Sequence, residues 1–133
     1  MFRRVLVVYG LVAGLASCAN VRSQSLQAEL GAESTLAPQA VVAVKAGIQV
    51  QFVSIVEDSR CPRDVTCVWA GETKARVLVR IDKQTPTSHD IVVGQPISIG
   101  AYRISVVAVQ PHPVSAAKIK PNDYRAIIKV EKP

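Results

Sequence analysis

From position 41 onward, apolar and polar residues alternate along short segments of the chain. Alternation with a period of two is typical of β-strands that bury one face. It is clearest in residues 73–81, where an apolar face made of Ala75, Val77, Val79 and Ile81 opposes a basic face made of Lys74, Arg76 and Arg80. Three further long strands are predicted, with inward faces made of Ile48, Val50 and Phe52; of Tyr102, Ile104, Val106 and Ala108; and of Tyr124, Ala126, Ile128 and Val130.

Shorter strands are predicted at 41–45, 90–93 and 97–99, separated by turns rich in Gly and Pro at 46–47, 83–88, 94–96 and 111–113. No apolar period of 3.6 persists, so helices have little support. Six or seven short strands between residues 41 and 133 predict an all-β fold, either a small antiparallel β-sandwich of immunoglobulin-like architecture or a barrel.

The N-terminus has a different pattern. A basic head, Met1-Phe2-Arg3-Arg4, precedes an uncharged apolar run of 12 residues from Val5 to Ala16. This order is typical of a secretory signal, and the run is too short for a transmembrane helix, which needs roughly 20 residues. We therefore expect residues 1–17 to be a signal peptide.

The run ends in Leu15-Ala16-Ser17-Cys18, which resembles the lipobox of bacterial lipoproteins. The resemblance implies a diacylglyceryl group on the Cys18 thiol and fatty-acyl chains such as palmitate, which together would anchor the protein firmly. By analogy with lipoprotein sorting in Gram-negative cells, Ala19 after the cysteine favours the outer membrane, with the domain facing the periplasm. The alternative is an ordinary cysteine beside a conventional cleavage site.

The odd number of cysteines agrees with lipidation of one of them. The chain has 3 cysteines, and an unpaired thiol is a liability in an exported protein. Lipidation of Cys18 leaves Cys61 and Cys67 to form a disulfide in an oxidising compartment. Closing so short a loop contributes on the order of 2 kcal/mol in the chain-entropy model.

Residues 18–40 are polar and lack a sustained apolar pattern. We expect the lipidated cysteine and a flexible tether here, with a short helical turn near 25–30 as an alternative for part of it, followed by the folded domain over residues 41–133.

The segment around the two cysteines is the candidate binding loop, with Asp58, Arg60, Arg63, Asp64 and Trp69 as its chemistry-bearing residues. Carboxylates at Glu57, Asp58 and Asp64 suggest a hard-cation site, but the two arginines between them would neutralise it. The preferred interpretation is a structural turn in which Asp58 pairs with or caps around Arg60. No metal is predicted, because the C-x5-C spacing matches neither the usual zinc site nor a redox C-x-x-C pair.

The order E-D-S-R-C-P, then C-V-W-A-G, then a strand of alternating valines resembles a group of small exported bacterial proteins and lipoproteins. The P-x-P turn and the strand Y-R-A-I-I-K-V extend the resemblance over about residues 48–131. The group has no established activity to carry over. Trp69, two residues after Cys67, is expected to pack on the sulfurs or to cap the end of the sandwich.

Charge and aromatic content narrow the function classes. The formal charge of +6 becomes +4 without the signal, since 14 basic and 10 acidic residues remain. Four aromatic residues remain as well, mostly on predicted core faces, so no stacking platform for nucleic acid is expected. Basic residues on strand 73–81 and late in the chain (Lys118, Lys120, Arg125 and Lys129) suggest a surface for anionic lipid headgroups, lipopolysaccharide or an acidic protein. A solvated sheet face is the preferred interpretation.

No catalytic motif or cofactor-binding motif occurs. His89 and His112 are the only candidates for a physiological-pH base, and a hydrolase using either one is the exception to a non-enzymatic prediction. The sequence therefore predicts an envelope lipoprotein with a periplasmic binding or accessory domain. The alternative is a lipoprotein inhibitor of a host or periplasmic hydrolase, although a charge of +4 suits basic lysozymes poorly.

Overall fold

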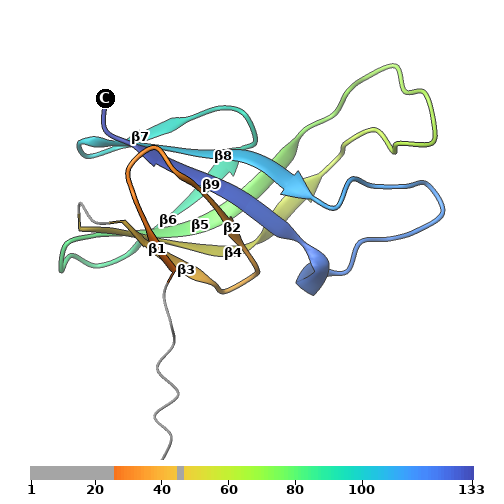
Figure 1. The fold of residues 1–133 in the computed structure, drawn as a ribbon. Coiled ribbons are helices and arrows are strands. Elements are labelled where there is room, and N and C mark those ends of the chain that lie inside the picture. The colour runs from red at the N-terminus through yellow and green to blue at the C-terminus, as the bar shows by residue number, and fades with distance from the viewer. Residues whose placement is uncertain (1–25, 45–46) are drawn as a thin grey trace, which may run out of the picture.

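The computed structural model describes residues 26–44 and 47–133, and in them the chain forms an open β-sandwich (Figure 1). One sheet has five strands in the order β1-β3-β4-β5-β6, and the other has four in the order β2-β9-β8-β7. Neither sheet closes into a barrel, which confirms the sandwich. The strands are β1 (Leu26–Ala28), β2 (Glu33–Leu36), β3 (Val41–Val44), β4 (Ile48–Asp58), β5 (Thr73–Ile81), β6 (Thr87–Val92), β7 (Ile97–Ile99), β8 (Tyr102–Gln110) and β9 (Arg125–Glu131).

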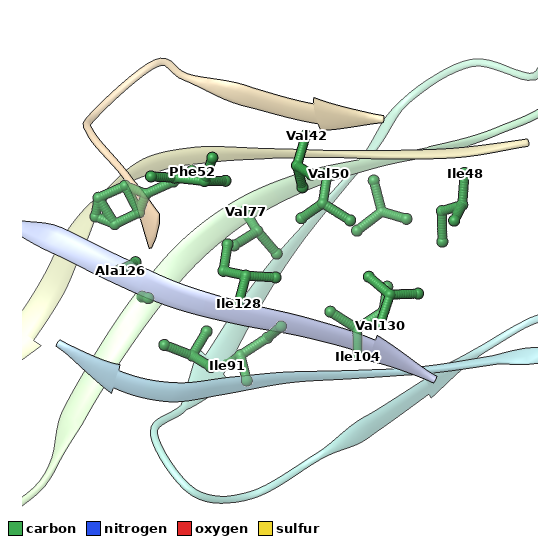
Figure 2. Packing of buried hydrophobic residues seen from close by; sticks show 14 of the residues in the cluster. Val42, Ile48, Val50, Phe52, Val77, Ile91, Ile104, Ala126, Ile128 and Val130 are labelled. Atoms are coloured by element: carbon green, nitrogen blue, oxygen red, sulfur yellow. The ribbon is translucent and has the colours of Figure 1, made fainter. Parts of the chain in front are cut away.

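The core lies between the two sheets and consists almost wholly of Val, Ile and Leu with one aromatic ring (Figure 2). Alternation places these side chains as predicted: on β5 the buried apolar residues are Ala75, Val77 and Val79, with Ile81 partly buried, and on β9 they are Ala126, Ile128 and Val130. β-Branched residues suit this arrangement because they pack well on a pleated surface.

Two irregularities change the expected alternation. On β8 the register shifts between Val106 and Ala108, so that Val109 is buried against Ala126 and Val107 is exposed. The prediction that Ala108 faces inward is wrong, because a β-bulge adds one residue and exchanges the inward and outward faces beyond it. β4 has similar shifts between Phe52 and Ser54 and between Ile55 and Glu57.

The prediction of a flexible tether is wrong for residues 26–28 and 33–36. Residues 26–28 form β1 beside β3, and residues 33–36 form β2 beside β9, with Leu36 completely buried. The helical turn near 25–30 is also wrong within the described residues, where β1 is a strand. These strands are too short to show a period, and their backbone hydrogen bonds are made with partners far away in the sequence. The signal peptide, Cys18 and residues 18–25 lie outside the described residues.

The connections determine which parts of the chain project. β1–β2 and β6–β7 cross between the sheets, and their turns bond to the opposite sheet through Gly31 N–H to the Val130 carbonyl at 2.7 Å and Gly94 N–H to the Val106 carbonyl at 2.9 Å. The long β4–β5 and β8–β9 connections leave the sandwich together at the other end (Figure 1). None of the helices in the described ranges is long and apolar enough to cross a bilayer.

Substituting Leu36→Ala tests whether the N-terminal strands belong to the domain. Because Leu36 is completely buried against both sheets, its truncation should lower the free energy of unfolding by about 2–5 kcal/mol. Leu26→Ala is the matched control, since Leu26 is 51% exposed, and should change stability by less than about 0.5 kcal/mol. Urea denaturation followed by circular dichroism measures both, and equal small effects would contradict the placement of β2.

Candidate functional site

Two loops at one end of the sandwich form the candidate site. The first is the cysteine loop, residues 59–72 between β4 and β5, and the second is the β8–β9 loop, residues 111–124. We call the outer parts of the two loops, residues 61–71 and 111–120, the tip.

The neck of the cysteine loop extends the β4–β5 ladder beyond the last paired residues. Ser59 N–H donates to the Glu72 carbonyl at 2.9 Å, the Ser59 hydroxyl contacts the backbone of Glu72 at 3.0 Å, and Cys61 N–H donates to the Ala70 carbonyl at 3.2 Å. Gly71 is required here: its φ is +72°, and a β-carbon would come within 1.9 Å of the Ser59 carbonyl oxygen. The neck therefore holds the two ends of the loop in close contact.

The predicted disulfide between Cys61 and Cys67 is present in the outer part of this loop. Together with the neck, it restricts the backbone on both sides of Pro62. The structure thus confirms the staple that the cysteine spacing predicted.

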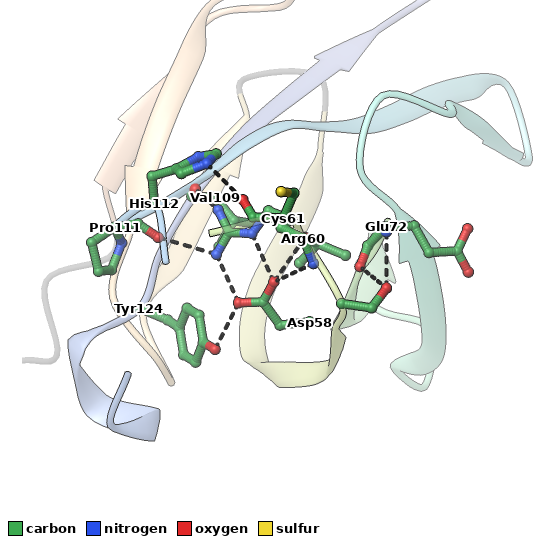
Figure 3. A network of polar contacts seen from close by, with 10 residues as sticks. Asp58, Arg60, Cys61, Glu72, Val109, Pro111, His112 and Tyr124 are labelled. Carbon is green, nitrogen blue, oxygen red and sulfur yellow. Dashed lines mark hydrogen bonds and ion pairs between the residues drawn. The ribbon is translucent and has the colours of Figure 1, made fainter. Parts of the chain in front are cut away.

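Arg60 lies at the junction of the two loops and binds both of them (Figure 3). Its Nε donates to Asp58 Oδ1 at 2.7 Å and its Nη2 to Asp58 Oδ2 at 2.8 Å, which makes a bidentate ion pair. The same guanidinium donates to the Val109 carbonyl at 2.8 Å and to the Pro111 carbonyl at 3.0 Å. The predicted pairing of Asp58 with Arg60 is confirmed, and it also connects residues about fifty positions apart.

Asp58 accepts further bonds from two other elements. The Tyr124 hydroxyl donates to Oδ2 at 2.9 Å, and the buried Thr73 hydroxyl donates to Oδ1 at 3.4 Å (Figure 3). The side chains of Asp58 and Arg60 are only 12% and 15% exposed, so their charges are largely removed from water. Such a pair is tolerated because its donors and acceptors are occupied.

These contacts shift the pKa values in the network. The Arg60 guanidinium lowers the pKa of the Asp58 carboxyl, although partial burial opposes the effect. Burial, followed by the bond to the Asp58 carboxylate, raises the pKa of Tyr124 to about 12. Asp58 is therefore the anion and Tyr124 the neutral donor throughout the physiological range.

A second set of bonds joins the outer parts of the loops. Arg63 N–H donates to the Pro113 carbonyl at 2.8 Å, and Ser115 donates to Asp64 through its N–H at 2.9 Å and also through its hydroxyl. These hydrogen bonds lower the pKa of Asp64. His112 Nε2 lies 3.2 Å from the Cys61 carbonyl and donates to it in the tautomer that carries the proton on this nitrogen. The two loops consequently form one unit.

The carboxylates considered for a cation site are separately engaged. Asp58 is ion-paired with Arg60, Asp64 accepts hydrogen bonds from Ser115, and Glu57 is ion-paired with Lys74 at 3.0 Å. Within the described ranges, no three His, Cys, Asp or Glu side chains come together as a metal site. His89 lies on β6 with its ring beside the Thr87 hydroxyl at 2.7 Å, whereas His112 is on the tip.

Trp69 differs most from the sequence prediction. It neither packs on the sulfurs nor caps the sandwich: it is 82% exposed, and Val68 beside it is 91% exposed. Val65 on the same loop and Val114 on the second loop are also exposed. Trp69 was predicted as a site residue, whereas these valines were not, because an isolated valine in a loop belongs to no periodic pattern.

Comparison of the chain with protein-family models, with curated proteins and with solved structures finds no match. The resemblance based on the cysteine segment stays a prediction, and function has to be argued from the tip itself.

Breaking the Arg60 network should be costly. In Arg60→Met, Asp58 keeps its charge in a largely buried place while two carbonyls lose a donor, so we expect a loss of about 3–5 kcal/mol in unfolding free energy. Arg76→Met is the matched control: its bidentate contact with Asp90 has bonds of 2.9 and 3.2 Å but is nearly half exposed, and its loss should cost much less than that of Arg60. Chemical denaturation at neutral pH compares them, and equal losses would contradict the role given to burial.

Proposed function

We propose that this protein is a lipid-anchored component of the bacterial envelope whose β-sandwich is a non-enzymatic binding module, with the tip as its contact surface. The observation that carries the binding role is the exposure of Trp69 and Val68 on a loop whose backbone is fixed by a disulfide and by Arg60. Large apolar side chains on a stiff support bind at low entropic cost, because little freedom is lost on association.

The proposed location rests on the N-terminal sequence. The basic head, the apolar run and Leu15-Ala16-Ser17-Cys18 support export, removal of residues 1–17 and lipidation of Cys18. Ala19 supports retention at the outer membrane with the domain facing the periplasm. The disulfide is compatible with that location because the periplasm is oxidising.

The arrangement of the tip favours binding over catalysis. His112 faces a backbone carbonyl rather than a nucleophile, and the carboxylates of Asp58 and Asp64 are consumed by structural hydrogen bonds. A hydrolase built on His89 or His112 has no further support from these contacts.

An inhibitor of a host or periplasmic hydrolase is the second candidate. It is favoured by the projection of both loops beyond the sheets (Figure 1), since a stiff convex loop can enter a cleft. In that case the tip would be the inhibitory element, and Val68 and Trp69 would lie inside the enzyme.

The proposal is tested by photocrosslinking in intact cells that express the full chain, with an ultraviolet-activated amino acid at position 68. We expect covalent adducts from position 68, because it is on the tip, and few from position 107, which is also exposed but lies on β8. A fatty-acid probe in the same cells should label the chain, and Cys18→Ala should abolish the labelling.

Each part of the proposal has its own contradicting outcome. Equal, low yields of adduct at positions 68 and 107 would contradict the contact surface. An unlabelled protein that is released in soluble form would contradict the anchor. Replacing Cys61 and Cys67 together should lower stability and leave labelling unchanged, which separates the disulfide from lipidation.

A further inference from the structure

Among the described residues, most cations that lie on strands contact neighbouring groups. Lys74 pairs with Glu57 and Glu72, Arg76 with Asp90, and Lys129 with Glu131. Arg80 donates to the Gln49 side chain, and Arg125 donates to two nearby carbonyls. The three ion-paired residues therefore add little net positive charge to the strand faces, whereas Arg80 and Arg125 keep theirs.

The cations outside these ion pairs include three on the tip. Within the described part of the chain, the side chains of Arg63, Lys118 and Lys120 are exposed and make no ion pair. The tip contains one carboxylate, that of Asp64, which accepts hydrogen bonds from Ser115. Three cations and one anion give these two short segments a formal charge of +2.

The same segments carry four of the eight large hydrophobic side chains that are exposed in the described residues: Val65, Val68, Trp69 and Val114. The bonds between Arg63 and Pro113 and between Asp64 and Ser115 keep the two loops, and hence their apolar and cationic residues, next to each other. The tip therefore combines an indole ring, aliphatic side chains and uncompensated positive charge on a convex surface.

We propose that the tip docks on a lipid bilayer that contains anionic phospholipid headgroups. Tryptophan prefers the membrane–water interface, where its ring is apolar and its N–H can remain hydrated. Valines beside it would enter the boundary between headgroups and acyl chains, and the arginine and lysines would meet the phosphates.

The size and shape of the surface support this occupant. A protein partner at a standard interface buries roughly 800 Å² on each side and has to match the shape of the tip over that whole area. A bilayer interface needs no such complementary surface, because it takes in single residues.

The inference rests on the lipid anchor in the proposed function. Cys18 precedes Leu26, the first residue of the sandwich, by only 8 positions. An extended chain of that length reaches at most roughly 28 Å, so an anchored domain stays within reach of its own membrane.

Trp69 fluorescence provides the test, because it is the single tryptophan of the chain. The full-length protein, purified from membranes, is reconstituted into vesicles of phosphatidylcholine with or without phosphatidylglycerol. We expect a blue shift of the emission and quenching by brominated phosphatidylcholine where phosphatidylglycerol is present. Emission of a water-exposed indole that aqueous iodide quenches equally in both vesicles would overturn the proposal.

A matched pair of variants tests the role of charge. Lys118→Gln with Lys120→Gln should weaken contact of the tip by about fivefold per lysine in vesicles with phosphatidylglycerol. Lys83→Gln with Lys132→Gln removes the same charge at the opposite end of the sandwich and should leave the quenching unchanged. Equal effects of the two pairs would overturn the proposal by showing that overall charge, rather than the tip, governs the contact.

Failure of the anchor and failure of docking are distinguishable. The mass of the N-terminal peptide reports acylation of Cys18 independently of Trp69. A protein without acylation is added to the vesicles from solution, and its Trp69 emission still reports docking. A protein adduct at position 68 in cells, together with no quenching by bromolipid, would support the proposed binding role of the tip. The same result would overturn the proposal that a membrane is its partner.

Discussion

The bidentate ion pair between Asp58 and Arg60 is the interaction on which the functional end of this molecule depends. A guanidinium has a rigid fork of donors, so it can bind a carboxylate along one edge and still direct further N–H groups elsewhere. Here these donors reach the carbonyls of Val109 and Pro111, which belong to the other sheet and its loop. A single side chain thus joins the β4–β5 connection to the β8–β9 connection across the open end of the sandwich.

The other contacts between the two loops depend on this junction. The disulfide fixes the shape of the cysteine loop but makes no bond to the second loop. The contacts of Arg63 with Pro113 and of Asp64 with Ser115 are exposed, and exposed hydrogen bonds are individually weak. Because Arg60 positions the loops beforehand, these weaker contacts form at little further entropic cost, and Trp69 can remain in solvent on a stiff support.

The features of this fold that depend on local sequence could be predicted. The alternation in 73–81 and in 124–130 predicted the buried faces of β5 and β9, and the spacing of Asp58, Arg60, Cys61 and Cys67 predicted a stapled turn with an internal ion pair. Features that depend on contacts between residues distant in the sequence could not be predicted. β2 is a strand because β9 pairs with it, and Leu36 is buried because both sheets surround it, although neither fact has a local period.

The site was partly predictable for the same reason. Tyr124 was expected on a core face, and it does pack against the core just before β9, but its bond to Asp58 spans 66 residues. The backbone acceptors at Val109 and Pro111 carry no side-chain signal at all. Trp69 was expected to be covered because it lies close to the disulfide in the sequence, but it is exposed on the outer part of the cysteine loop.

Native-state hydrogen exchange of two backbone amides tests the junction most directly. Arg63 N–H bonds to the second loop and Ser115 N–H to the first, so each reports the joining of the loops. If Arg60 holds them together, both amides should exchange more than about tenfold faster in Arg60→Met than in Arg76→Met, while the Ile128 amide in central β9 remains the most protected of the three. Unchanged exchange at Arg63 and Ser115 in Arg60→Met would contradict the account, because the loops would then hold together without the ion pair.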